Sequence, residues 1–537
     1  MKRVHQVLMG LAAVGLLFNV VVYGLYAANL IQFPFDYDQG EGFELVDTVM
    51  FSQFKLPYLN TEQYPFYSSN YPPVYHIIAA PFVPLFGAQY WYGRLLSFLS
   101  TLVTAGAIAY AVYRAQPHRG IALFAGLAFL SSNTVYHIGP LFRQHIFMVM
   151  FETLAVVVLA YAFPRRSWRG LLLGAILLIA AGYTKQLAAI TAASILVWMF
   201  VRQPRRAFLW GLGFAAGGAL IFVLLNVASS GEWWRQAIVA NTGKIDPLQV
   251  FDLFKLWWHL HGFLIILAVI YVLYETYIGR WSLYTIWFLA AAGLGGAASG
   301  TWGGGDSYFS TSIAALCLLS GIAAARFVNQ GWTFTPRWSK PIERFLQNQR
   351  VHAVVLIVIP LLYLGYARAT LKMPTDGPVF GPLAQILGVN ATYEGRFFDS
   401  ATYDVGGYAH IGHMVTPQDT AAGWQIVDLM RQTEGLVLSE EAGFVLAAGR
   451  QVITNPTQLK NLETAGLFKG TELIEMLENR EFGLLVMRGQ LYPSEVLRAM
   501  GTHYDWTDTI LMNGFEYQIW YPKSATRSRD GLPHTQP

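Results

Sequence analysis

Four acidic residues stand within nine positions of one another, directly after the first long apolar segment of the chain: Asp36, Asp38, Glu41 and Glu44. They belong to the sequence FDYDQGEGFE, in which two glycines favour a tight turn. A carboxylate held by such a turn can take the proton from an acceptor hydroxyl, which is the task of a general base. A loop that leaves a membrane is also wet, so the same acids can simply be solvated. The rest of the chain has to distinguish these two interpretations.

The composition is that of a polytopic membrane protein. Hydrophobic residues make up 54% of the 537 residues and charged residues only 13%, with a mean hydropathy of +0.38, whereas soluble domains contain about 25% charged residues. The formal net charge of +4 is small, and the basic residues stand in short clusters between apolar segments, which argues against nucleic acid as a partner. The single cysteine, Cys317, excludes an intrachain disulfide and a cysteine metal cluster.

The first apolar segment, residues 7–30, follows a basic N-terminus. Its length is that of a membrane span, and the preceding Lys2 and Arg3 place the N-terminus in the cytoplasm. The next loop, residues 31–73, therefore lies outside and carries the four acids. Within it, residues 43–54 have apolar side chains at helical spacing, which predicts an amphipathic helix lying on the membrane.

Lys185 occupies the middle of an apolar stretch, residues 171–201, that has an arginine cluster at each end. Both clusters are expected in the cytoplasm, so the stretch has to cross the membrane twice. One straight helix would leave the lysine near the bilayer centre, at a cost of about 2.5 to 3.5 kcal/mol. Two short helices that meet at residues 182–186 instead bring Lys185 to the outer surface, on the same side as Asp38 and Glu41.

Twelve segments are candidates for membrane spans. Besides the first segment and the two halves of the hairpin, they are residues 74–86, 95–112, 121–138, 146–163, 208–227, 256–274, 281–300, 308–325 and 354–366. An even number would return the tail to the cytoplasm, whereas the basic residues of 326–350 belong in the cytoplasm and place the tail outside. We therefore expect about 11 to 13 transmembrane helices, with residues 74–86 either not crossing or concealing a missed span.

The composition changes at about residue 369 to that of a soluble domain. Four stretches favour strands and three favour helices: strands at 435–443, 451–455, 481–487 and 516–522, and helices at 457–467, 472–480 and 494–504. The chain thus divides into a membrane domain, residues 1–368, and an extracytoplasmic α/β domain, residues 369–537. The second domain has no GxGxxG sequence and no P-loop, so nothing in it indicates nucleotide binding.

On this topology the outer face combines the first-loop acids with two cations, Arg143 and Lys185, and with a glycine-rich turn that ends in Asp306. A carboxylate beside cations at a lipid surface suits a reaction whose leaving group is a lipid phosphate. Taken singly, Arg143 can reach the interface from a helix end and Lys185 can merely solubilise a hairpin tip. Their shared side is what supports the hypothesis.

Several motifs resemble those of the prokaryotic C-type glycosyltransferases (GT-C), the group that includes lipid A aminoarabinose transferases and protein O-mannosyltransferases. The resemblance covers most of the chain and rests on DQGEG at 38–42, YPPVYH at 71–76, GRLLS at 93–97, TKQ at 184–186, GGGDSYF at 303–309 and SEEAG at 439–443. It implies a first-loop carboxylate as base, Asp38 or Glu41. The residues that it implies for the donor phosphate are Lys185, Arg143, Arg94 and Gln186. Those that it implies for substrate binding are Asp36, Tyr71, Asp306 and Tyr308.

The resemblance implies an inverting transferase that moves a hexosyl or pentosyl group from a polyprenyl-phosphate sugar to an extracytoplasmic lipid, glycan or protein. The sequence requires no metal, and the involvement of a divalent cation stays open. Two other classes of protein also stay open. A transporter or flippase would line a path near the midplane with its charges. The second class is a catalytically inactive scaffold. It stays open because the sequence RQH at 143–145 departs from the Arg-x-Asp pattern of the family.

Overall fold

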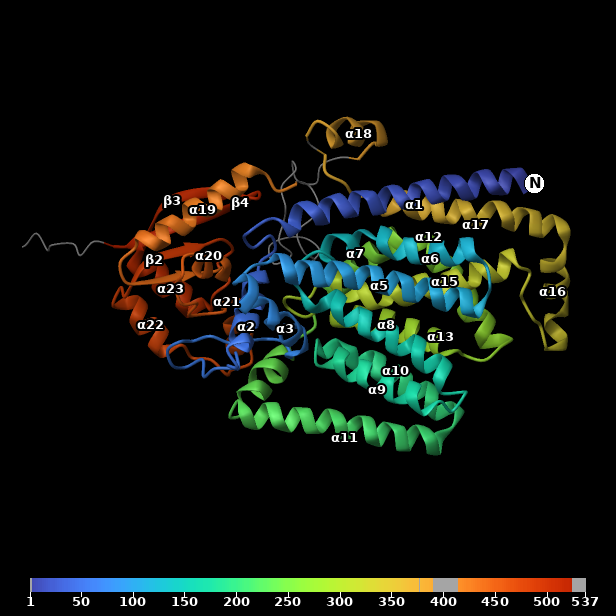
Figure 1. Ribbon diagram of the computed structural model, residues 1–537, viewed down its shortest axis with the longest axis horizontal. Coiled ribbons are helices and arrows are strands. Elements are labelled where there is room, and N and C mark those ends of the chain that lie inside the picture. The colour runs from blue at the N-terminus through green and yellow to red at the C-terminus, as the bar shows by residue number, and fades with distance from the viewer. Residues whose placement is uncertain (1, 376, 390–413, 524–537) are drawn as a thin grey trace, which may run out of the picture.

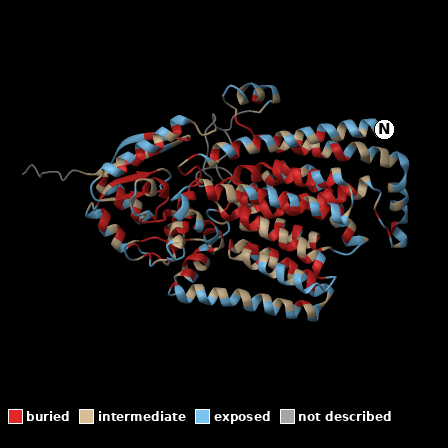
Figure 2. Ribbon diagram, in the orientation of Figure 1, coloured by how far each residue is buried: buried red, intermediate tan, exposed pale blue. Residues whose placement is uncertain are grey.

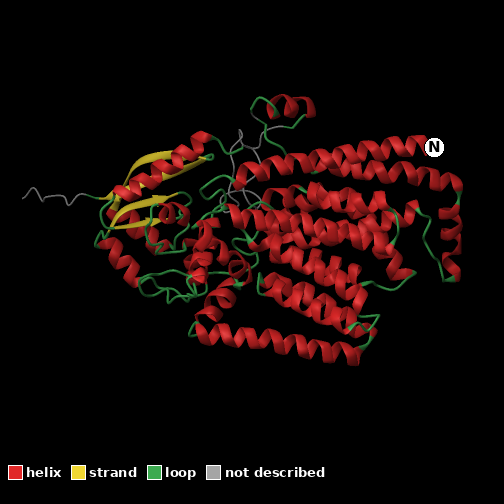
Figure 3. Ribbon diagram, viewed as in Figure 1, coloured by secondary structure: helices red, strands yellow, loops and turns green. Residues whose placement is uncertain are grey.

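The computed structural model describes residues 2–375, 377–389 and 414–523. Most of this part is helical, and the helices form a long bundle that has the C-terminal domain at one end and the N-terminus at the other (Figure 1). The strands of the described chain all belong to the C-terminal domain (Figure 3). This arrangement confirms the predicted architecture, a polytopic helical membrane protein with a C-terminal α/β domain.

Among the described residues, seven helices are long and apolar enough to cross a membrane. They are α1 (Lys2–Ile31), α5 (Trp91–Ala115), α8 (Gln144–Ala162), α11 (Pro204–Ala228), α12 (Pro247–Tyr277), α15 (Ser310–Val328) and α17 (Gln349–Ala369). Four shorter apolar helices pack with them: α6 (Arg119–Ser131), α9 (Trp168–Gly182), α10 (Ala189–Arg202) and α13 (Leu283–Ala290). The described bundle therefore has eleven helices of this kind.

The segment at residues 74–86 is broken into pieces of 6, 3 and 4 residues: α3 (Val74–Ala79), η1 (Ala80–Phe82) and α4 (Val83–Phe86). At about 1.5 Å per residue they would extend about 20 Å, which is less than the roughly 30 Å of a bilayer core. α3 packs against α2 (Glu41–Ser52), beside the C-terminal domain (Figure 1). With this segment set apart the helix count is odd, and the tail leaves the bundle at the end opposite the N-terminus.

Helix α15 occupies the middle of the bundle, and its residues 310–325 are all buried. They read STSIAALCLLSGIAAA, small or apolar on every side, which suits a helix surrounded by other helices. It packs against α5, α6, α8 and α12. By contrast, α11 has a single buried residue, Ala207, and lies at the edge of the bundle (Figure 2). The bundle thus has a dry centre and a peripheral helix that is apolar but uncovered.

The predicted hairpin at residues 171–201 is confirmed. Helix α9 ends at Gly182, a turn passes through Lys185, and η2 (Gln186–Ala188) leads into α10. The setting predicted for the helix at 43–54 is wrong. Helix α2 is present, but its residues 41–48 are all buried, and it packs against α3 and against α20 (Ala442–Ala447) of the C-terminal domain. Its polar face meets protein partners, so an amphipathic pattern does not here indicate a surface helix.

The C-terminal domain contains a four-stranded sheet with the order β1-β2-β4-β3. β1 (Leu436–Ser439) and β2 (Phe482–Met487) are parallel, and β4 (Phe515–Pro522) is antiparallel to both β2 and β3 (Tyr504–Met512). The helices around it are α19 (Pro417–Gln432), α20, α21 (Pro456–Thr464), α22 (Thr471–Glu478) and α23 (Ser494–His503). The strand expected at 451–455 does not form. β3 was not predicted, because polar residues along its exposed stretch break the apolar alternation.

The remaining short helices of the described chain are α7 (Asn133–Ile138), η3 (Trp234–Ile238), η4 (Val239–Asn241), η5 (Ala291–Gly295), α14 (Gly296–Ala298), η6 (Asp306–Phe309), η7 (Arg337–Ser339), α16 (Lys340–Gln347) and α18 (Phe380–Leu387). α18 follows the membrane domain and packs on α1 through Phe18 and Val22. In the described part that starts at residue 414, α19 is the first element of the sheet domain.

Candidate active site

A left-handed turn starts the first-loop helix and brings a cation to the backbone. Gly40 precedes α2 with φ 98°, a conformation that glycine adopts readily. A side chain at this position would meet the guanidinium of Arg143 at 2.9 Å. Arg143 also donates to the carbonyl of Gln39. The glycine of DQGEG therefore lets Arg143 lie flat against the turn.

Glu41 and Arg94 form a fully buried ion pair that fastens the first loop to the bundle. Arg94 donates from Nε to one carboxylate oxygen at 2.9 Å and from a terminal nitrogen to the other at 2.8 Å. Arg94 also donates to the carbonyls of Leu30, Phe33 and Phe35. Glu41 also accepts the backbone N–H groups of Tyr37, Asp38 and Phe142.

The electrostatics of Glu41 follow from these contacts. Burial opposes its ionisation, but the charge and hydrogen bonds of Arg94 and the backbone donors outweigh that effect and keep its pKa below the usual value. The hydrogen-bonding capacity of both side chains is used by the protein. The geometry therefore favours a structural role for both, although the sequence hypotheses placed Glu41 in catalysis and Arg94 at the donor phosphate.

Asp36 joins the first loop to the C-terminal domain. Its carboxylate accepts the Tyr90 hydroxyl at 2.7 Å and the backbone N–H groups of Gly42 at 2.5 Å and Gly443 at 3.1 Å. A side chain at Gly443 would collide with Asp36 and Tyr90, which explains the glycine of SEEAG. Burial raises the pKa of Asp36. The residue expected to bind substrate thus lies fully buried at a domain junction.

Asp38 and Glu44 share one cation, Arg143, which directly precedes α8. Arg143 donates to one oxygen of Asp38 from Nε at 3.2 Å and from a terminal nitrogen at 2.8 Å. Its other terminal nitrogen lies 3.7 Å from Glu44. With its amide nitrogen turned toward the carboxylate, Gln144 donates to both Glu44 oxygens at 3.0 and 3.2 Å. Two carboxylates from the first loop and one guanidinium therefore meet at a single place.

Glu44 is poised between its charged and neutral forms. Burial raises its pKa to about 7, against the opposing charges of Arg143 and Lys185. His76 lies on its other side, with Nε2 3.2 Å from Glu44 and 3.8 Å from Asp47. Burial also raises the pKa of Asp47 well above its usual value. A carboxyl group that titrates near neutral pH is suited to general base catalysis.

Lys185 lies at the hairpin turn with its ammonium between two tyrosine rings. Nζ is 4.9 Å from the ring centroid of Tyr71 and 4.8 Å from that of Tyr308, and it contacts Nε2 of His145. No carboxylate in the described part of the chain forms an ion pair with it. Burial and the charge of Arg143 lower its pKa well below the usual value. A bound phosphate would supply the absent negative charge and several hydrogen-bond acceptors.

The other residues expected at the site lie around this centre. Asp306 is 3.9 Å from His137 and 3.5 Å from the Thr134 hydroxyl, so it packs against α7. Gln186 donates to the carbonyls of Asn70 at 3.2 Å and Ala237 at 2.5 Å, which ties the hairpin turn to the first loop. The structure thus brings together Asp38, Arg143, Lys185, Tyr71 and Tyr308, and places Asp306 and Gln186 at its edge.

A buried carboxylate beneath the site was missed from the sequence. Glu152, two helical turns after His145 on α8, accepts the hydroxyls of Thr191 at 2.5 Å and Thr311 at 2.6 Å. These hydrogen bonds join α8, α10 and α15. His145 belongs to the first turn of α8, Lys185 comes shortly before α10, and Tyr308 comes shortly before α15. The signal was present, since an acid inside an apolar segment is expensive and usually has a role. Glu44 was likewise counted among the acids but not assigned a role.

Across the described residues, no group of three or more His, Cys, Asp and Glu side chains is arranged to hold a metal ion.

Comparison with known proteins gives a partial sequence match and several matches in fold. Residues 70–230 match the family model described as dolichyl-phosphate-mannose-protein mannosyltransferase. No match is found among curated protein sequences. ArnT from Cupriavidus metallidurans bound to undecaprenyl phosphate is similar over 96% of this chain and 98% of that chain, at 15% identity and a TM-score of 0.56. The apo form of the Archaeoglobus fulgidus oligosaccharyltransferase is similar over 93% of this chain and 73% of that chain, at 12% identity and a TM-score of 0.50.

At these identities the likeness is one of fold. It defines the class as a polytopic helical membrane protein with an α/β domain docked on the loops at one end of the bundle. The fold is thus the one found in ArnT and in the oligosaccharyltransferase, and the family-model match over residues 70–230 agrees with the resemblance to GT-C glycosyltransferases. The resemblance noted in its motifs is thereby confirmed.

Proposed function

We propose that the protein is a membrane glycosyltransferase that transfers a hexosyl or pentosyl group from a polyprenyl-phosphate donor to a lipid, glycan or protein acceptor. The observation that carries this proposal is the meeting of Lys185, which has no ion-pair partner in the described chain, with the carboxylates Asp38 and Glu44 across Arg143. The similar ArnT structure contains undecaprenyl phosphate, which supports a lipid phosphate as the leaving group.

In the proposed reaction, the donor phosphate lies against Lys185 and the exposed edge of Arg143. The acceptor hydroxyl gives its proton to a first-loop carboxylate while its oxygen attacks the anomeric carbon. The bond from that carbon to the phosphate oxygen breaks, and polyprenyl phosphate leaves with the bonding electron pair. Attack opposite the leaving group inverts the anomeric carbon. Lys185 and Arg143 stabilise the charge that develops on the phosphate.

We propose Asp38 as the general base. The second candidate for this role is Glu44 rather than Glu41. Asp38 faces Arg143 through one of its oxygens. Glu44 has a pKa of about 7, so a substantial fraction can accept a proton at neutral pH. Glu41 already accepts five hydrogen bonds, two of them from Arg94, and this argues against a proton transfer role for it.

The site is proposed to face the extracytoplasmic side, together with the C-terminal domain. Both lie at the end of the bundle opposite the N-terminus (Figure 1). The basic residues at the N-terminus and in the loops at residues 165–169 and 202–206 support a cytoplasmic position for the other end. The acceptor would then be a molecule of the cell envelope.

The proposal is tested by measuring the transfer of radiolabelled sugar in membranes supplied with a mixed pool of polyprenyl-phosphate sugars. The membranes contain the wild type, Asp38→Asn, Glu44→Gln or Lys185→Met. Asp428→Asn is a matched control, because that carboxylate is exposed on α19, away from the site. We expect transfer in the wild type and the control, and its loss in Asp38→Asn. Transfer undiminished in an Asp38→Asn/Glu44→Gln double variant would refute the mechanism. Label moved across proteoliposomes without transfer would instead identify a transporter.

A further inference from the structure

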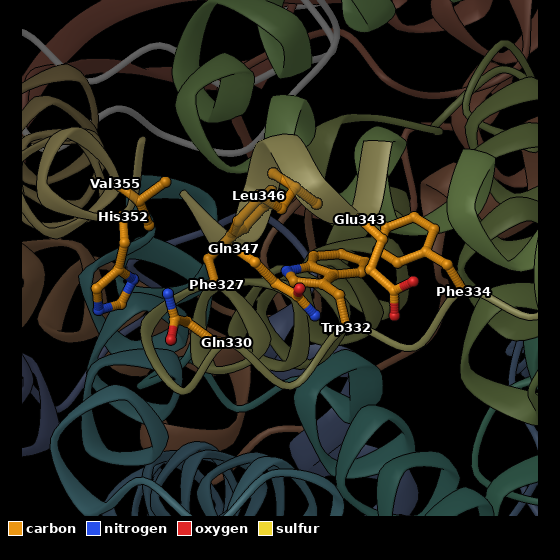
Figure 4. Close-up of a pocket in the computed structure, with 9 residues that line it drawn as sticks. All are labelled: Phe327, Gln330, Trp332, Phe334, Glu343, Leu346, Gln347, His352 and Val355. Atoms are coloured by element: carbon orange, nitrogen blue, oxygen red, sulfur yellow. The ribbon is translucent and has the colours of Figure 1, made fainter. Parts of the chain in front are cut away.

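A second feature of the molecule lies far from this site, at the N-terminal end of the bundle. A largely apolar groove runs between the last turns of α12, the end of α15 and helix α16. Figure 4 shows its deep part, where the polar side chains of Gln330, Glu343, Gln347 and His352 also belong to the lining. Its deep and outer parts are both lined by Phe327, Trp332, Phe334 and Leu346. The outer part continues along α12 past Leu273 and Tyr277 and has a cavity volume of about 260 Å³, a little below the range of about 300 to 1,000 Å³ of ligand pockets.

The outer wall of this groove is uncovered. Along α12, Leu273 and Tyr277 are 49% and 65% exposed, and Trp338, just before α16, is 59% exposed. Aromatic residues of this kind concentrate where a bilayer meets water. The groove therefore opens toward the position of lipid at the end of a bundle of membrane helices.

Cations stand in the sequence next to residues that line the groove. Arg337, Arg344 and Arg350 are exposed, and in the described chain they form no ion pair, whereas Lys340 is neutralised by Glu343 at 2.7 Å. In the sequence RWSKPIERF, residues 337–345, basic side chains alternate with Trp338, Ile342 and Phe345. The segment thus places positive charge and apolar surface side by side, as helices that lie on anionic membranes do.

One further arginine is built into the wall. Arg326 at the end of α15 lies 5.2 Å from the ring centroid of Tyr274 and 5.8 Å from that of Trp332, two rings that line the groove. It donates to the Tyr274 hydroxyl at 3.2 Å, while its buried Nε–H has no hydrogen-bond acceptor in the described chain. No described carboxylate forms an ion pair with it, so this end of the groove carries uncompensated positive charge.

We propose that the groove is a binding site for an anionic phospholipid of the leaflet on the N-terminal side. One acyl chain lies along Leu273, Phe334 and Leu346, and the headgroup phosphate faces the arginines at the rim. Charge complementarity selects this occupant, since apolar surface alone would accept any lipid, whereas the arginines favour a headgroup with net negative charge. The site is independent of the proposed sugar transfer.

Titration of the purified full-length protein with phosphatidylglycerol and with phosphatidylcholine of identical acyl chains, followed by native mass spectrometry, tests the proposal. We expect the wild type to retain phosphatidylglycerol more tightly. In Arg337→Ala/Arg344→Ala/Arg350→Ala this preference falls by about tenfold, equivalent to about 1.4 kcal/mol. The matched control is Arg165→Ala/Arg166→Ala/Arg169→Ala, which removes three exposed arginines from another loop at the same end and keeps the preference.

A second variant tests the groove itself without a change of charge. Leu346→Trp fills the space that both parts of the groove share, and we expect it to weaken retention of both lipids. Monodisperse elution and an unchanged thermal midpoint in phosphatidylcholine show that each variant is folded. Equal retention of the two lipids by the wild type, an equal loss in the two triple variants, or full retention by Leu346→Trp would each overturn the proposal. Displacement of the lipid by inorganic phosphate alone would show that only the charge is recognised.

Discussion

Replacing Glu41 by Gln separates a structural carboxylate from a catalytic one, and it requires no knowledge of the sugar. Glutamine preserves the shape and can accept some of the backbone N–H groups, but it cannot balance the charge of Arg94, which is fully buried. An uncompensated buried charge costs about 3 to 5 kcal/mol. Folded proteins are stable by about 5 to 15 kcal/mol in total. We therefore expect Glu41→Gln to lower the thermal midpoint and the yield of folded protein strongly.

The same substitution three residues later provides the control. Burial raises the pKa of Glu44 above its usual value of 4.5, so the fold disfavours its charged form. Glu44→Gln should leave the thermal midpoint unchanged at pH 4 and raise it at pH 8, because the cost of burying Glu44 builds up as the pH rises from its usual pKa of 4.5 to its folded-state pKa of about 7, and is complete above that. Both variants are compared in one detergent by thermal unfolding. A Glu41→Gln protein as stable as the wild type, yet inactive, would refute the structural role and restore Glu41 as a base.

Three further predictions follow from the site. If Glu44 is the base, transfer rises with pH through about 7 and Glu44→Gln removes this limb; an unchanged pH profile would exclude Glu44. Lys185→Met should raise the KM for the donor by about 10- to 100-fold, as expected for loss of a charged hydrogen bond of about 1.5 to 3 kcal/mol. Lys185→Arg should bring the KM part of the way back to the wild-type value. If both variants have the wild-type KM, Lys185 does not bind the donor phosphate. Glu152→Ala should lower both the thermal midpoint and kcat, whereas Glu152→Gln keeps most of both because an amide can serve both threonines; equal losses in the two variants would show that the charge itself is needed.

The sequence predicted the architecture well because membrane helices are specified locally. Length, apolar content and flanking arginines identify each span without reference to its neighbours. The cost of burying Lys185 even located the hairpin turn, which the structure confirms. Residues 74–86 were ambiguous for the same reason: their composition is apolar, but whether they cross depends on α2, against which they pack.

The candidate site was predicted less completely, since its chemistry depends on contacts between distant segments. Asp38, Glu41 and Glu44 are close together in the sequence, which does not distinguish them. Only the fold shows that Arg94 forms an ion pair with Glu41, whereas Arg143 lies beside Asp38 and Glu44. Likewise, α2 has the pattern of a surface helix, and the domain that covers it lies some 400 residues further along the chain. Local patterns do not report such pairings.

The hydrogen bond from Gly443 to Asp36 joins residues that lie 407 positions apart in the chain. Asp36 leaves the ribosome early, whereas its partner is made only after the last helix of the bundle. During synthesis, a chain whose membrane part is already inserted can therefore hold its first loop through Arg94 but still lacks the partner of Asp36 in the C-terminal domain. Its assembly is completed from outside by the final domain, so a truncated product with a full set of membrane helices would lack the contact that closes the loop.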